Sequence, residues 1–113
     1  MTLDATFAAL ADPTRRAVVD LLRKRPRSAG EIAAALEKRP PAMSRHLRVL
    51  RECGLVAEAR GDEDARVRVL RLRTEPFDAL QRWLDEVQHF WTGQLAAFKT
   101  HAERRRVVTR KRG

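Results

Sequence analysis

Residues 40–53 place basic and apolar side chains on opposite sides of a predicted helix. The apolar side consists of Met43, Leu47 and Leu50. The opposite side consists of Pro41, Ser44, Arg45 and Arg48, and no acidic residue follows before Glu52. Because arginine can donate two hydrogen bonds to guanine, and phosphates favour a helix N-terminus, this pattern predicts a helix that enters the major groove of DNA. A solvated surface helix without a ligand is the alternative that this stretch alone leaves open.

Two further helices are predicted near the N-terminus. The first covers residues 3–11, where the apolar residues at helical spacing are Leu3, Phe7 and Leu10. Asp12 is a good N-cap and Pro13 suits the first helical position, so a second helix is expected over residues 13–24.

A helix-turn-helix is predicted to follow. Ser28 and Glu31 have the spacing of a capping box, which begins a short helix over residues 29–36. The brief segment 37–39 joins this helix to residues 40–53. Two short helices joined so closely are typical of a helix-turn-helix whose second helix reads DNA.

A β-hairpin is predicted after Gly54, where the apolar period becomes strand-like. Its strands cover residues 55–60 and 67–72, and a slip in the alternation at Val69 and Leu70 predicts a bulge or the end of pairing. A hairpin directly after such a helix is a wing, so we expect three of its arginines to approach phosphate: Arg60, Arg66 and Arg68. The alternative is that they pair with the acidic turn formed by Asp62, Glu63 and Asp64.

The last predicted helix, over residues 76–103, carries more apolar surface than a domain of this size can bury. Its apolar and aromatic residues are Phe77, Leu80, Trp83, Leu84, Val87, Phe90, Trp91 and Phe98. We expect one strip to pack on the winged domain and the other to meet a second copy of the chain. The alternative is that both strips fold back on the same chain.

Length, composition and charge indicate one domain over residues 1–103. The chain has 113 residues, and it shows neither an apolar run near 18 residues nor a signal peptide. One cysteine, Cys53, cannot form an internal disulfide, which favours a cytoplasmic setting. The net charge is +9, but residues 104–113 hold six basic and no acidic groups. This segment is predicted to be a disordered tail that adds nonspecific affinity for phosphate.

Three blocks of sequence, at residues 9–16, 31–36 and 41–56, resemble the ArsR/SmtB family of bacterial winged-helix repressors. The resemblance implies a mainly α fold with a small β-hairpin, in the order α-α-α-α-β-β-α. It also implies a homodimer that represses transcription from an inverted-repeat operator. The DNA-contact candidates by motif position are Pro41, Ser44, Arg45, His46 and Arg48, with Arg66 and Arg68 in the wing. The implied dimer interface comprises Leu3, Phe7, Leu80, Trp83, Leu84, Val87, Phe90, Trp91 and Phe98.

The sequence departs from the family pattern in its cap and in its metal ligands. Arg39 replaces the usual serine N-cap of the DNA-reading helix and cannot accept a hydrogen bond, although it and Lys38 could reach phosphate. Residues 32–36 contain no thiol, and the last helix lacks the ligand spacing of the sensor members. Neither a metal nor another cofactor is therefore expected, and no inducer can be identified.

Two functions remain open. The first is a sequence-specific DNA-binding regulator that uses residues 40–53 and the wing over 55–73. The second is a nonspecific nucleic-acid-binding or architectural module driven by the basic tail. An enzyme is not expected, because the chain has no Gly-rich phosphate loop and no Ser/His/Asp constellation.

Overall fold

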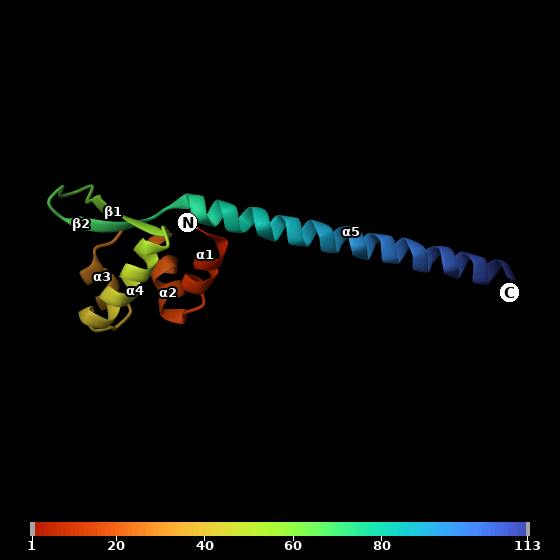
Figure 1. The fold of residues 1–113 in the computed structure, drawn as a ribbon, viewed down its shortest axis with the longest axis horizontal. Coiled ribbons are helices and arrows are strands. Elements are labelled where there is room, and N and C mark those ends of the chain that lie inside the picture. The colour runs from red at the N-terminus through yellow and green to blue at the C-terminus, as the bar shows by residue number, and fades with distance from the viewer. Residues whose placement is uncertain (1, 113) are drawn as a thin grey trace. The chain divides into compact units, whose positions relative to one another are not determined.

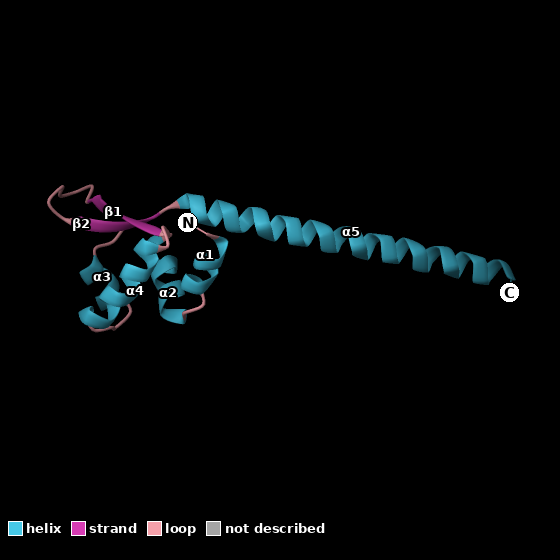
Figure 2. Ribbon diagram, viewed as in Figure 1, coloured by secondary structure: helices cyan, strands magenta, loops and turns pink. Residues whose placement is uncertain are grey.

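The computed structural model describes residues 2–112, and it describes side chains for residues 2–104. The elements in chain order are α1 (Leu3–Leu10), α2 (Pro13–Leu22), α3 (Ala29–Ala35), α4 (Pro40–Glu52), β1 (Val56–Arg60), β2 (Arg68–Leu72) and α5 (Thr74–Arg112) (Figure 1). Helices dominate, and the strands form one antiparallel hairpin (Figure 2). The predicted winged helix-turn-helix fold is thus confirmed. Two compact units divide the chain after Leu80, the second consisting of the remainder of α5.

The core of the first unit is built from every helix and from both strands in this unit. Its buried residues are Ala9, Val18, Leu22, Ile32, Ala33, Met43, Leu47, Leu50, Leu55, Val56 and Leu70. The predicted apolar side of α4 is fully buried, as expected for a helix that packs on one face only. Fully burying a leucine contributes roughly 1.5–3 kcal/mol, so α4 is anchored chiefly by this side.

Local capping explains where the helices begin and end. Asp12 Oδ1 accepts the amide hydrogen of Arg15 at 3.0 Å, and Ser28 and Glu31 form the predicted capping box. α4 has no side-chain cap at Arg39, as the sequence indicated. It ends in a Schellman motif, in which Gly54 has φ of 74° and the amide of Leu55 donates to the carbonyl of Leu50 at 2.9 Å.

α3 ends in the same motif, but a glutamate takes the position that glycine usually occupies. Glu37 has φ of 54°, in the left-handed region. The amide of Lys38 donates to the carbonyl of Ala33 at 2.9 Å, which closes the turn between α3 and α4. The helix-turn-helix therefore contains one backbone conformation that a glutamate adopts at a cost.

The hairpin is regular, so the prediction of a bulge or an end of pairing at Val69 and Leu70 is wrong. Pairing runs without interruption from Val56 opposite Leu72 to Arg60 opposite Arg68. Val69 and Leu70 are both buried because both faces of β2 are covered at this point. The other edge of β2 is paired too, since the backbone of Leu70 exchanges hydrogen bonds of 2.7 and 3.2 Å with that of Arg27.

α5 is longer than the predicted helix over 76–103. It begins at Thr74, and its backbone stays helical through Arg112, so it includes most of the segment that was expected to be disordered. Arginine and lysine are good helix formers, and no proline or glycine follows Gly93 before residue 113. Residue 113 and the side chains beyond Arg104 lie outside the described part of the chain. A domain boundary after residue 103 stays a prediction.

Candidate DNA-binding surface

The outer side of α4 presents the side chains that the sequence singled out. Pro41, Ser44, Arg45 and Arg48 are exposed, directly opposite the buried Met43, Leu47 and Leu50. Among the described side chains, neither Arg45 nor Arg48 has an ion-pair or hydrogen-bond partner. Both guanidinium groups are consequently free to fork onto a base edge or a phosphate.

The N-terminal end of α4 is electropositive for two reasons. Its first turn has no acidic residue and no side-chain cap, so the positive end of the helix dipole is uncompensated, although Pro40 and Pro41 carry no amide hydrogen. Lys38 and Arg39, immediately before it, are exposed. This combination favours a phosphate at the start of the helix.

The three wing arginines differ in how they are engaged. Arg66 pairs with Asp64, its Nε lying 3.3 Å from Oδ1, which is the alternative that the sequence left open. The backbone amide and then the side chain of Arg66 hold the pKa of Asp64 below its ordinary value. Arg60 donates to the carbonyl of Ala65 at 3.0 Å and so closes the turn. The side chains of Arg66 and Arg68 are 91% and 85% exposed, so both remain accessible to DNA.

A charge cluster not foreseen from the sequence links α4 to the wing. Glu58 on β1 pairs with Arg51 in the last turn of α4, and its Oε2 lies 3.9 Å from Arg68 Nη1 on β2. Ser44 lines the same small cleft as these residues. The structure thus brings a predicted helix contact and a predicted wing contact to one place. Sequence spacing across a helix, a turn and a hairpin gives no signal for this cluster.

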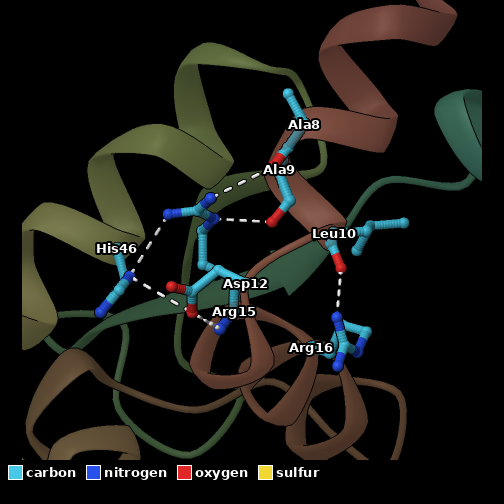
Figure 3. Close-up of polar contacts among 7 residues, drawn as sticks. All are labelled: Ala8, Ala9, Leu10, Asp12, Arg15, Arg16 and His46. Carbon is cyan, nitrogen blue, oxygen red and sulfur yellow. Dashed lines mark hydrogen bonds and ion pairs between the residues drawn. The ribbon is translucent and has the colours of Figure 1, made fainter.

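His46 belongs to a second polar cluster, which was also missed (Figure 3). Its Nδ1 lies 3.5 Å from Nη1 of Arg15 and 3.9 Å from Oδ1 of Asp12. The side chain of His46, a predicted DNA contact, is only 25% exposed. Asp12 was predicted only as a cap, and it also faces α4. Its pKa is lowered chiefly by the backbone hydrogen bond from Arg15 and to a smaller extent by His46.

The residues predicted for a dimer interface are mostly exposed in a single chain. Leu3 and Leu80 are half-buried, and the exposed members are Phe7, Trp83, Leu84, Val87, Phe90, Trp91 and Phe98. Leu95, which was not among the residues predicted for the interface, is also 60% exposed. The members in α5 are too many to be the singly scattered apolar residues that are normal on a protein surface.

Two further observations concern the described part of the chain only. Among its residues, no three histidine, cysteine, aspartate or glutamate side chains lie close enough together to hold a metal ion. None of its helices combines the length and apolar character needed to span a membrane.

The fold and this surface define a winged helix-turn-helix DNA-binding protein. Residues 12–58 match the family model for the bacterial regulatory proteins of the arsR family. The HTH-type transcriptional regulator Rv2034 of Mycobacterium tuberculosis is 38% identical over 95 residues, which cover 84% of this chain and 83% of the relative. The chain belongs to the ArsR family of transcriptional regulators. The predicted family is therefore confirmed, and so is the prediction of a regulator in place of an enzyme.

Two further similarities agree with this assignment. The transcriptional repressor SdpR of Bacillus subtilis is 34% identical over 58 residues, which cover 51% of this chain and 64% of that repressor. The solved structure of an ArsR-like transcriptional regulator from Rhodococcus sp. RHA1 superposes with a TM-score of 0.71 at 31% identity. That match covers 87% of this chain and 90% of the Rhodococcus chain.

Proposed function

We propose that this regulator is a homodimeric repressor in the cytoplasm that binds an inverted-repeat operator through α4 and the wing. The observation that carries the proposal is the exposed row of Ser44, Arg45 and Arg48 above a fully buried apolar side. Such a helix can enter the major groove without disturbing the core that holds it. Repression is supported by the similarity to SdpR, which is itself a transcriptional repressor.

The operator geometry follows from a dimer of winged domains. Two copies of α4 related by a two-fold axis would read half-sites about one helical turn apart, or a multiple of that spacing. Arg45 and Arg48 would specify bases. Phosphate contacts that set the register on the duplex would come from Lys38, Arg39 and Arg68. The base contacts would be flanked by Pro41 and His46. The wing would be completed by Arg60 and Arg66. The exposed apolar residues of α5 support association of two copies.

The test is a selection from random-sequence DNA by the full chain, followed by a search for the selected motif upstream of the gene. The proposal expects an inverted repeat and a preference for it over random duplex at physiological salt. Arg45→Ala and Arg48→Ala should each weaken binding by about 5–150-fold and relax the preference at one position. Arg23→Ala is the matched control, because Arg23 is an exposed arginine on a different surface, paired with Asp20.

The competing function is a nonspecific nucleic-acid-binding module. It is favoured by the six basic residues in 104–113, against a surplus of only three positive charges in the preceding residues. Truncation after residue 103 separates the two functions. Specific binding that survives truncation supports the operator reader, whereas loss of most binding together with an absent sequence preference supports the nonspecific module.

A further inference from the structure

Arg15 connects three helices through one planar group (Figure 3). Its Nε donates to the carbonyl of Ala9 at 2.6 Å, and its Nη2 donates to the carbonyl of Ala8 at 3.2 Å, at the end of α1. Arg15 itself lies in α2, and its Nη1 reaches His46 on α4. Because the guanidinium is rigid, the two bonds to α1 fix the direction in which Nη1 points.

His46 receives this contact at an atom that also faces an acid. Its Nδ1 lies between Nη1 of Arg15 and Oδ1 of Asp12, which is held in place by capping α2. With a lone pair on Nδ1, the ring accepts a hydrogen bond from Arg15. With a proton on Nδ1, the ring is repelled by Arg15 and instead donates toward Asp12. The two states of the ring therefore have different partners on the α1–α2 side.

We propose that Arg15 and Asp12 are positioning residues for DNA binding, which act through His46 to hold α4 in its reading orientation. His46 follows Arg45 directly and precedes Arg48 by two residues, so a shift of its side chain moves the segment that carries both arginines. Since Arg15 is anchored on α1, a displacement of α1 would reach α4 through the same group. This inference rests on the proposed function of α4 as the operator reader.

The simpler explanation is that Arg15 only fastens α1 to α2. Arg16 provides the matched comparison, because its Nη1 donates to the carbonyl of Leu10 at 2.7 Å, also at the end of α1. Among the described side chains, Arg16 has no hydrogen bond or ion pair with α4. If fastening α1 were the whole role, replacing either arginine would affect DNA binding to the same extent.

The experiment measures the affinity of the full chain, by fluorescence anisotropy, for the duplex that the wild type selects from random DNA. We expect Arg15→Gln to weaken binding about three- to tenfold and Arg16→Gln less than about twofold. In a His46→Ala background, Arg15→Gln should add less than about twofold, because the contact is already absent. Circular dichroism melts verify that each variant is folded at the assay temperature. If Arg15→Gln is not folded, Arg15→Lys replaces it.

A pH series supplies a signature that a purely structural role would not give. Asp12 and Arg15 are the charged groups on α2 that face His46, and a proton on Nδ1 exchanges the second of these partners for the first. The coupling between Arg15→Gln and His46→Ala should be largest at pH 8 and decline toward pH 5.5. Asp12→Asn keeps a capping oxygen while removing the charge, so it should weaken binding at pH 5.5 more than at pH 8.

Each outcome bears on the positioning role of Arg15 or on operator binding by α4. Equal losses for Arg15→Gln and Arg16→Gln, or an Arg15→Gln loss of the same size in the His46→Ala background, overturn the positioning role while operator binding stands. A coupling that does not change with pH overturns the assignment of the contact to the Nδ1 lone pair. A wild-type chain that selects no sequence overturns the operator proposal and this inference together.

Discussion

The left-handed residue in the helix-turn-helix gives a prediction whose size can be worked out. Glu37 has φ of 54° at the end of α3, where its amide donates to the carbonyl of Ala34 at 3.2 Å. A left-handed conformation costs a residue with a Cβ about 1–2 kcal/mol. Glycine avoids that cost but loses about 0.5–1 kcal/mol through the greater freedom of its unfolded chain. The difference between these two ranges is about 0–1.5 kcal/mol, so Glu37→Gly should raise the free energy of unfolding by roughly 0.8 kcal/mol.

For a domain of this size, that gain corresponds to a rise in Tm of roughly 2–6 °C. The assay is thermal unfolding followed by circular dichroism, at one protein concentration, since association would make Tm depend on concentration. Glu37→Ala is the control, because it removes the same carboxylate and keeps the left-handed cost. Equal stabilisation by alanine and glycine would show that the carboxylate, not the backbone conformation, was the destabilising feature. A lower Tm for the glycine variant would refute the reasoning outright.

Three further predictions concern association, the wing and acid stability. Phe90→Glu should raise the dissociation constant of the proposed dimer at least tenfold in sedimentation velocity. His89→Glu should not, because helical periodicity places His89 opposite the centre of the apolar residues of α5. Glu58→Gln should lower the free energy of unfolding by no more than about 1 kcal/mol, since the ion pairs of Glu58 are exposed. It should also increase DNA affinity at low salt, because it removes a negative charge beside Arg68. Unchanged affinity would contradict this prediction. Three carboxyl groups have lowered pKa values in the folded chain: Asp12, Glu31 and Asp64. The stability that they contribute is complete above their pKa values in the unfolded chain. It is lost as the pH falls through their pKa values in the folded chain. Urea unfolding between pH 5 and 3 should accordingly show a flatter acid decline for Asp12→Asn than for the wild type, and identical declines would contradict the linkage.

Features governed by neighbouring residues could be predicted from the sequence. Asp12 with Pro13, Ser28 with Glu31, and Gly54 set the helix limits through local hydrogen bonds and backbone preferences, and each was found where expected. The burial of Met43, Leu47 and Leu50 followed from helical periodicity in the same way. These rules need only a few residues of context, which the sequence supplies directly.

Features governed by distant residues could not be predicted. The bulge was expected because Val69 and Leu70 break the alternation, yet the break arises from cover on both faces of β2 and from pairing with Arg27. The contact of Arg15 with His46 joins residues 31 positions apart, and nothing in either segment indicates it. The same limit applies to the pair formed by Glu58 and Arg51, which meet only once the hairpin has folded onto α4.

These two unpredicted contacts bear on how α4 is held. Burial fixes the apolar side of the helix, but a row of aliphatic contacts alone leaves rotation about the helix axis less constrained than directional bonds do. Each half of α4 makes one polar link to a neighbouring element. His46 contacts Arg15 on α2, and Arg51 pairs with Glu58 on β1. Both involve charged side chains outside the core, so each can be weakened without loss of the buried contacts. In the proposed complex with DNA, the orientation of Arg45 and Arg48 would thus be adjustable separately from the stability of the fold.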